Sequence, residues 1–520
     1  MPNRNEDTMS RGLLSRIATT LVLGCGCDMT PADSGPDAGP ADAGPPPLTI
    51  EWSACTAAGG EVPAECADVA VPIDWADGEG PSVTVFVKRI TRPDTTGQLW
   101  LLAGGPGGSG KDFESAIEEI QALASDLDLY LLDHRGTGGS DYLDCPGLVP
   151  PLGGWSQLDP ARVTSCVDAL TGNQADALRA TRTTQAAQDL GALIATVRGP
   201  NDRVVVAGAS YGTYWLHRYL QLFPTQPSAV VLDSVCDRCG QWLEYERSHD
   251  RLGRALLSEC AADALCASKL GADPEAFLQA LVSSATPVCP DVVRAFGTSS
   301  VKVMAGVLLE NPFAQHYLPA FLYRLARCEP RDVTALTTLL SRRTSGLSRT
   351  SIATFLQVSL ADLAPAPPIS EVEAFEATAL FSKELDFLTA IAGPVWPAAV
   401  PDPWVGSYAE TTVPMLMING VLDPQTTIEE ARSFAAHFTG PEQYLVELPR
   451  TVHGAVFGSA TAAPPADPMP CGAEIMRLFL QSPGTRPDTS CTEDILVGDG
   501  FSLGPEADEY LWGTTDIWEG

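Results

Sequence analysis

Lysine is scarce in this chain of 520 residues, and so are aromatic residues. Only five of the 32 basic residues are lysines, they face 65 acidic residues, and the formal net charge is −33. Such a surface repels nucleic acid phosphates, so the composition excludes a nucleic-acid partner. Hydrophobic residues make up 45% of the chain and aromatic ones 7%, which indicates a folded globular protein with room for one large domain and an insertion.

Long hydrophobic runs are also missing, since no segment approaches the ~20 apolar residues that a transmembrane helix requires. The one apolar stretch near the start, residues 17–23, follows Arg11 and Arg16 and runs into Gly24-Cys25. A basic segment, a short apolar segment and small residues are typical of an export signal. Residues 22–25 (VLGC) resemble a bacterial lipobox, which predicts a lipoprotein-type signal at 1–27, acylated at Cys25. An ordinary cleaved signal is the alternative.

A segment poor in apolar residues follows, with the sequence TPADSGPDAGPADAGPPP at 30–47. It has almost nothing to bury, so it cannot offset the entropy cost of ordering. We therefore expect residues 28–48 to be a Pro/Gly/Ala/Asp-rich linker. Together with the signal, it predicts an exported protein of the cell envelope or the medium. Its expected partner is the membrane, through an N-terminal lipid anchor.

Twelve cysteines remain after Cys25 and Cys27, and in an oxidising compartment an even number is typical of disulfides. Pairing cannot be fixed from sequence. We expect sequential neighbours to pair, foremost Cys55–Cys66, Cys260–Cys266 and Cys471–Cys491. The CxxC at 236–239 leaves a metal site as a rival, but a single pair without a second at matched spacing is weak evidence.

Short apolar runs that end in Gly, Asp, Asn or Pro alternate with helix-like segments. The runs lie at 83–90, 99–103, 127–132, 204–207, 229–232, 414–418 and 444–448. Such alternation predicts an α/β fold with a mostly parallel sheet flanked by helices, whose ligands sit at the carboxyl ends of the strands. Between 236 and 403, helical periodicity predominates and predicts a helical cap. We expect a core formed by two segments, 49–235 and 404–495, with the cap at 236–403 inserted between them and an acidic tail at 496–520.

The strongest chemical signal is Gly208-Ala209-Ser210-Tyr211-Gly212, which directly follows the strand at 204–207 and precedes a helix-like segment. In a GxSxG elbow the serine occupies a strained strand-to-helix turn, and a side chain at either glycine would collide with the neighbouring strand and helix. This context predicts that Ser210 is a nucleophile.

A base and an acid complete the predicted triad, in the chain order Ser, Asp, His. Of the six histidines, only His437 and His453 lie near the end of the sheet region. The helical pattern at 427–438 contains His437, whereas His453 lies in a loop after the strand at 444–448. Asp423 lies just past the strand at 414–418, where its carboxylate would hold the tautomer of His453. A turn-forming Asp-Pro is the alternative for Asp423.

An oxyanion hole is expected from the glycine-rich segment at 104–110, GGPGGSG. The backbone N–H groups of Gly105 and of Tyr211 are the expected donors. The segment lacks the Lys-Ser/Thr of a phosphate-binding loop and the spacing of a dinucleotide fingerprint. Acyl transfer at these residues requires no metal or cofactor.

These motifs resemble a known family. GGPGGSG at 104–110, DHRGTGGS at 133–140, GASYG at 208–212 and GVLDP at 420–424 are similar to motifs of the tripeptidyl aminopeptidase and proline iminopeptidase family of α/β-hydrolases. Residues 52–75 and 471–491 resemble the secreted tripeptidyl aminopeptidase branch. The resemblance implies the α/β-hydrolase fold, a peptide substrate with a free N-terminus, and structural roles for Asp133 and Arg135 beside the site.

The sequence departs from the family in two places. Ala103 stands where cytosolic proline iminopeptidases usually carry His, which favours the secreted branch. Acidic cap residues hold the substrate ammonium in the relatives, and here Glu244 and Glu246 are the candidates, with surface charge as the rival interpretation. An esterase or other small-molecule acyl hydrolase stays open, because the triad chemistry is shared and fold does not fix substrate. A non-catalytic binding protein on the same fold is a third possibility.

Overall fold

A computed structural model describes residues 48–77, 80–145, 148, 160–237, 242–311, 313–343, 350–363, 367–383, 391, 395–396, 402–464, 466, 468–497 and 501–520. The chain divides into two compact units, Met1–Gly44 and Pro45–Gly520, and the described residues all belong to the second. The expected signal and nearly all of the linker lie outside the described residues, with Cys25 among them, and so does Cys239.

Nine strands of the described chain form one sheet, in the order β1-β2-β3-β5-β4-β6-β7-β8-β9. From β5 onward in this order all neighbours are parallel, whereas β1, β2, β3 and β5 pair antiparallel. The seven expected strands are all present, and β1 and β2 add an edge that the sequence did not indicate. Their bounds are β1 Ser53–Ala57, β2 Val62–Pro72, β3 Ser82–Ile90, β4 Gly97–Leu102, β5 Leu127–Leu132, β6 Arg203–Ala209, β7 Ala229–Asp233, β8 Met415–Gly420 and β9 Gln443–Leu448.

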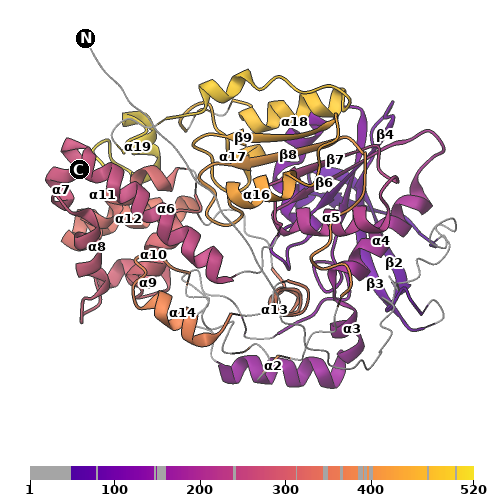
Figure 1. The fold of residues 1–520 in the computed structure, drawn as a ribbon, viewed down its shortest axis with the longest axis horizontal. Helices are drawn as coiled ribbons and strands as arrows, with labels where there is room; N and C mark the ends of the chain where they lie inside the picture. Colours follow the sequence, from indigo (N-terminus) through magenta and orange to yellow (C-terminus); the bar gives the residue numbers. More distant parts are fainter. Residues whose placement is uncertain are drawn as a thin grey trace, which may run out of the picture. The chain divides into compact units, whose positions relative to one another are not determined.

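Helices cover both faces of the sheet, because the central strands are apolar on both sides. In β6, Val204 and Val206 pack with α4 (Thr183–Val197), α5 (Tyr211–Leu222) and α16 (Ile428–Ala435). The alternating residues of the same strand pack with α1 (Ile117–Leu123) and α18 (Cys471–Gln481). In Figure 1, α18 and α16 accordingly lie on opposite sides of β8. This layered core confirms the α/β-hydrolase class.

The expected insertion is helical and has its own hydrophobic core. Its helices α6 to α12 lie together beside the sheet, at the left of Figure 1. Its helices are α6 Trp242–Ala262, α7 Ala264–Leu270, α8 Pro274–Val282, α9 Pro290–Phe296, α10 Val301–Leu308, α11 Ala314–Arg327, α12 Pro330–Arg343, α13 Ile352–Ala361 and α14 Ile369–Glu376. The remaining elements are η1 Ala58–Gly60, η2 Gly110–Ala116, α2 Pro160–Asn173, α3 Ala175–Ala180, α17 Ala455–Gly458, η4 Ser490–Asp494 and α19 Pro505–Trp512. No helix within these described segments is long and apolar enough to cross a membrane.

The last twenty residues are more than an acidic tail. They include α19, which packs against α12, and they bury Trp512 and Trp518 in the core of the cap. Arg324 of α11 donates to the carbonyl oxygens of Asp516 and Ile517 at 2.7 and 2.6 Å. Residues 501–520 therefore pack as part of the cap, although they are far from residues 236–403 in the sequence.

Five disulfides whose cysteines both lie in the described residues join neighbours in the cysteine order of the sequence. They are Cys55–Cys66, Cys145–Cys166, Cys260–Cys266, Cys289–Cys328 and Cys471–Cys491. Cys236 is also disulfide-bonded, which removes the free thiolate that a metal site at the CxxC would need.

Candidate active site

Ser210 occupies a sharp turn between β6 and α5, with a backbone φ of 56° and ψ of −126°. A non-glycine residue is rarely found there, and such strain is typical of functional sites. A Cβ added to Gly208 would lie 2.3 Å from the carbonyl oxygen of Gly212, and one added to Gly212 would lie 2.2 Å from that of Leu102. Both glycines are therefore required by packing, as the sequence predicts.

The imidazole of His453 contacts a buried carboxylate. Its Nδ1 lies 2.8 Å from Oδ2 of Asp423, whose side chain is fully buried. Asp423 also accepts from the backbone N–H of Gln425 and from both the N–H and the hydroxyl of Thr426. Because a carboxylate only accepts, Nδ1 carries the proton of the neutral ring and Nε2 is left as the basic nitrogen.

Negative charge around His453 favours its protonated form. Burial by itself would lower the pKa of this histidine, but the carboxylates of Asp423, Asp233 and Glu310 outweigh burial, and the pKa is raised. Such an imidazole accepts a proton readily, which is what a general base needs. Among the described residues no hydrogen bond joins His453 to Ser210 Oγ, and such bonds often form only when substrate is bound.

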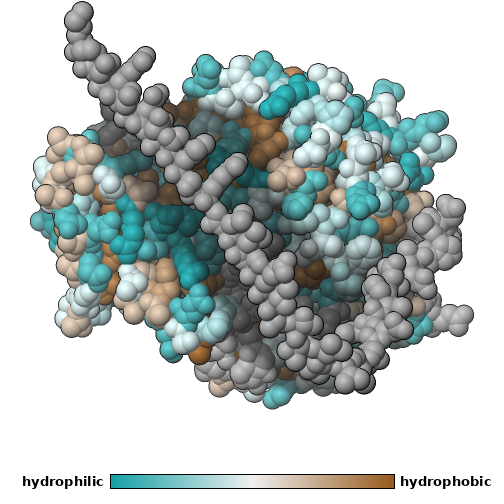
Figure 2. Space-filling view, viewed as in Figure 1, coloured by the Kyte–Doolittle hydropathy of each residue, from teal (hydrophilic) through white to brown (hydrophobic). Residues whose placement is uncertain are grey.

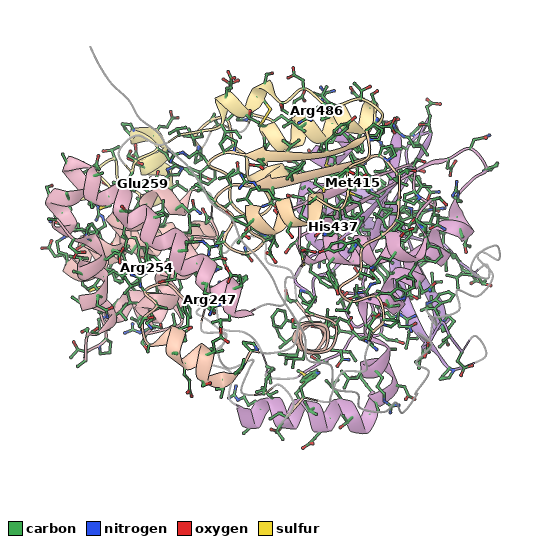
Figure 3. All side chains as sticks on the ribbon, in the orientation of Figure 1. Arg247, Arg254, Glu259, Met415, His437 and Arg486 are labelled. Atoms are coloured by element: carbon green, nitrogen blue, oxygen red, sulfur yellow. A yellow bond between two sulfur atoms is a disulfide. The ribbon has the colours of Figure 1, made fainter. Side chains whose placement is uncertain are left out.

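His437, the other histidine near the end of the sheet region, is a structural residue. Its ring stacks on Tyr408, with 3.5 Å between the ring centroids, beside the end of α16 (Figure 3). This geometry agrees with the predicted helical position of His437. Within the described residues, no hydrogen bond joins its ring to Ser210 or Asp423.

The glycine-rich loop lies directly beside Ser210, the predicted nucleophile. A Cβ added to Gly104 would lie 2.9 Å from Cβ of Ser210 and 3.5 Å from its Oγ, so only glycine allows this approach. Gly105 follows with a φ of 117°, also a conformation that favours glycine. Gly105 therefore directly follows a residue that contacts Ser210, and Tyr211 directly follows Ser210 at the start of α5. The oxyanion-hole role of their backbone N–H groups stays a prediction.

Two contacts brace this loop from outside. The carbonyl oxygen of Gly107 accepts the N–H of Ser351, the N-cap of α13, at 2.9 Å. The carboxylate of Asp133 accepts the N–H groups of Gly110 and Gly139, both at 2.7 Å. The buried guanidinium of Arg135, two residues further along, forms an ion pair with Asp189 of α4. Asp133 therefore braces the loop, as the resemblance implies, whereas Arg135 connects the segment after β5 to α4 and to the carbonyl oxygens of Pro72 and Ile73.

The side chain of Tyr211 is held by a directed chain of hydrogen bonds. Nδ1 of His134 donates to the carbonyl oxygen of Arg135, because a carbonyl can only accept, and Nε2 is therefore an acceptor. The Tyr211 hydroxyl donates to this Nε2 at 3.1 Å, and that of Thr183 donates to Tyr211 at 2.8 Å. Burial lowers the pKa of His134 to about 4, so the ring stays neutral. This chain fixes the first residue of α5 and hence its N–H.

The two cap carboxylates proposed from sequence are engaged elsewhere. Glu244 has 45% of its side chain exposed and pairs with Arg247 and Arg251 on the same helix. Arg247 is labelled in Figure 3, and the face of the cap that is turned to the viewer carries many hydrophilic residues (Figure 2). Glu246 is 1% exposed, and its carboxylate accepts the N–H of Lys383 at 2.8 Å. The prediction that Glu244 and Glu246 bind a substrate ammonium is therefore wrong. Arginines and solvent contact the carboxylate of Glu244, and a backbone N–H binds that of Glu246.

A third cap carboxylate, Glu310, acts electrostatically on His453. It follows α10, accepts both ammonium contacts of Lys383 at 2.9 Å, and contacts the hydroxyl of Tyr245 and Nε2 of His249. Tyr245 in turn contacts Gln425, two residues beyond Asp423. The cation of Lys383 and the ring of His249 hold the pKa of Glu310 well below its usual range despite burial, so this carboxylate is charged.

Sequence reasoning missed this cluster because its members are far apart in the chain. Glu310 and Lys383 are 73 residues apart, and neither belongs to a recognisable motif. It also missed Thr426, whose hydroxyl lies 2.8 Å from Asp423 and 3.3 Å from His453. Three or more His, Cys, Asp or Glu side chains suited to a metal ion do not converge anywhere in the described residues.

The chain is similar to known serine peptidases, although no family model matches it. It is 28% identical to the tripeptidyl aminopeptidase of Streptomyces lividans over 235 residues, 39% of this chain and 41% of that protein. It is 28% identical to the serine protease Hip1 of Mycobacterium tuberculosis over 275 residues, 47% of this chain and 51% of that protein. The matches thus span about half, or less, of the length of these relatives.

Solved structures with a related arrangement are more distant in sequence. A proline iminopeptidase of Mycobacterium smegmatis is 15% identical, with 75% of this chain and 92% of that chain covered and a TM-score of 0.34. An esterase of Exiguobacterium antarcticum is 12% identical, with 72% and 90% covered and a TM-score of 0.30. Likenesses at this level indicate nothing about activity. The strand order and the elbow after β6 identify an α/β-hydrolase, and the sequence comparisons confirm the predicted resemblance to tripeptidyl aminopeptidases.

Proposed function

We propose that this protein is a serine peptidase that cleaves peptide bonds near a free N-terminus, through an acyl-enzyme on Ser210. The observation that supports it best is the convergence of three loops: the strained elbow of Ser210, the buried Asp423 and the imidazole bonded to it. Each loop follows the carboxyl end of a parallel strand, where ligands of such sheets bind.

The proposed reaction uses each group in turn. His453 Nε2 takes the proton of Ser210 Oγ as Oγ attacks the scissile carbonyl carbon, and the N–H groups of Gly105 and Tyr211 stabilise the resulting oxyanion. His453 then gives that proton to the leaving amine. A water molecule, deprotonated by the same Nε2, attacks the acyl-enzyme and releases Ser210. Asp423 stabilises the imidazolium in both halves.

The preference for a free N-terminus rests on the names of the relatives and on Glu310. An α-ammonium group is costly to desolvate without a partner. Glu310 is charged, partly accessible, and one of the three carboxylates that raise the pKa of His453. Its Oε2 accepts only from Lys383 among the described residues, which leaves a lone pair for a substrate ammonium. We therefore assign the ammonium contact to Glu310.

We further propose that the protein is exported and held at the membrane by a lipid on Cys25, which lies outside the described residues. The lipobox-like sequence and the linker support the anchor. The disulfides support an oxidising compartment.

The proposal is tested first on the nucleophile. Ser210→Ala is expected to abolish labelling by a fluorophosphonate probe and to lower kcat by on the order of 10⁴-fold or more. Retention of wild-type turnover by the variant would refute the assignment of Ser210.

Substrate class is tested by comparing tripeptidyl and aminoacyl anilides, their N-acetylated counterparts and short acyl esters. An aminopeptidase is expected to cleave the free anilides roughly 10- to 150-fold faster than the acetylated ones, which lose one charge-assisted hydrogen bond. Equal rates on free and blocked peptides would reject this activity. Turnover of esters alone would favour the small-molecule hydrolase.

A further inference from the structure

Two residues at the carboxyl end of β7, Asp233 and Ser234, contact the backbone on both sides of the triad. Their side chains are buried, with 9% and 0% of each residue exposed. The backbone carbonyl oxygen of Asp233 accepts the N–H of Ser210 at 2.9 Å. This bond fixes the nucleophile elbow to the neighbouring strand.

The side chains of the same two residues hold the loop that carries His453. Oγ of Ser234 accepts the N–H of Gly454 at 2.9 Å and that of Ala455 at 3.3 Å. Oδ1 of Asp233 accepts the N–H of Val456 at 3.2 Å and the hydroxyl of Ser234 at 3.1 Å. Three successive N–H groups after His453 are therefore bound by one two-residue unit.

The backbone conformation of this unit is unusual. Ser234 has a φ of 60°, which costs a non-glycine residue free energy and persists only where surrounding contacts impose it. Those contacts are its own N–H to the carbonyl oxygen of Ile418, at 2.8 Å, and the N–H of Val235 to Oδ1 of Asn419, at 2.7 Å. In this strained conformation the hydroxyl of Ser234 lies within hydrogen-bond distance of the loop that follows His453.

We propose that Asp233 and Ser234 are positioning residues of the triad: Ser234 fixes the loop of His453 relative to Ser210, and the charge of Asp233 stabilises the imidazolium. The proposal rests on the proposed triad and adds to it two residues that do not react. Asp233 is not a second catalytic acid, because Nδ1 of His453 is bound by Asp423 and no hydrogen bond joins Asp233 to the ring within the described chain.

The charges at this position are coupled. Burial raises the pKa of Asp233 to about 6, while His453 opposes that rise, and Asp233 in turn helps to raise the pKa of His453. The other charged groups that act on this ring are Asp423 and Glu310, the latter paired with Lys383 and His249. His453 must be neutral to act as a base, so activity is lost as the pH falls through its pKa. Removing the charge of Asp233 lowers that pKa and moves the acid limb to lower pH.

The experiment measures the second-order rate constant of labelling by a fluorophosphonate probe as a function of pH, in the full chain. This readout needs the triad but no knowledge of the natural substrate. Asp233→Asn keeps an acceptor for the N–H groups and removes the charge, so its acid limb is expected to lie lower by about half a pH unit or more. Asp362→Asn is the matched control, since it neutralises an equally buried carboxylate that Arg182 binds and should leave the limb in place.

The hydroxyl is tested separately with Ser234→Ala and Ser234→Gly. Glycine adopts a positive φ without strain, so Ser234→Gly removes the hydroxyl and also relieves the backbone strain at this position. Both variants are expected to be labelled roughly 10-fold more slowly, from a looser histidine loop, with an unshifted acid limb. Labelling of Ser234→Gly at the wild-type rate would overturn the positioning role, even if Asp233→Asn failed to fold.

These experiments also distinguish a failure of the proposed roles of Asp233 and Ser234 from a failure of the proposed triad. An unshifted limb in folded Asp233→Asn, with normal labelling of Ser210, rejects the role of Asp233 and leaves the triad intact. Undiminished labelling of Ser210→Ala would reject the triad, and with it both proposals.

Discussion

Under the proposed function, neutralising Glu310 should remove the preference for a free N-terminus. In Glu310→Gln the side chain keeps its shape but no longer carries the charge that would pair with a substrate ammonium. A charge-assisted hydrogen bond contributes ~1.5–3 kcal/mol, so the wild type should prefer the free over the N-acetylated anilide by roughly 10- to 150-fold in kcat/KM. In the variant we expect this ratio to fall to within about 3-fold, mainly through slower cleavage of the free substrate.

Glu310→Gln should also destabilise the protein, and this loss of stability must be distinguished from the loss of the substrate contact. Lys383 is 12% exposed and loses its only carboxylate partner among the described residues, and such a loss costs about 3–5 kcal/mol in a buried pair. The double variant Glu310→Gln/Lys383→Met removes both charges and should recover some of the lost stability in a thermal melt. It should still show no preference for the free N-terminus.

Two single variants serve as controls for the same assay. Lys383→Met keeps the carboxyl group and removes its internal cation, so the preference should persist, because a substrate ammonium can then take the place of that cation. Glu244→Gln neutralises an exposed carboxylate on the same cap and should change nothing. A folded Glu310→Gln enzyme that still prefers the free substrate by the wild-type factor would refute the assignment of the ammonium to Glu310.

The remaining predictions concern the acid, a disulfide and the anchor. Asp423→Asn should lower kcat by about 10⁴-fold with an unchanged far-UV CD spectrum, because the wrong tautomer of His453 is then favoured; unimpaired turnover would place the acid elsewhere. Replacing Cys471 and Cys491 by Ser opens a short loop at α18 and should reduce the free energy of unfolding by about 3 kcal/mol, as measured with urea. An unchanged midpoint would show that packing of α18 suffices. Cys25→Ser should move the protein from the detergent phase to the aqueous phase, and intact-mass detection of an unacylated wild-type N-terminus beyond residue 27 would contradict the anchor.

The sequence predicted the central sheet well because its strands are buried on both faces. The runs at 204–207 and 229–232 consist of Ala, Val and Leu alone, as expected of strands that are buried on both faces. The strands β1 and β2 were missed because neither is an apolar run: β1 has only one buried residue, and β2 alternates regularly only in its second half, at 67–71. The C-terminal helix α19 was missed because only Trp512 and a few neighbours are apolar, and their burial depends on the cap.

Some residues of the candidate site could be predicted from local sequence, and others could not. The elbow of Ser210 is a local motif, and the chain order of the fold restricts its partners to Asp423 and His453. Asp233 ends an expected strand, but an aspartate after a strand is also a common turn residue, so nothing in the sequence distinguished it. Glu310 and Lys383 meet only once the cap has folded, and no spacing rule connects residues that far apart.

The locality of the disulfides bears on how the chain could fold during export. The widest described pair, Cys289–Cys328, spans 39 residues, and the others span 21 or fewer. A chain that emerges from a translocation channel with its N-terminus first presents each cysteine shortly before its partner. Oxidation can therefore follow the order of emergence, with each correct partner arriving next, so the chain needs little reshuffling by an isomerase before the sheet is complete.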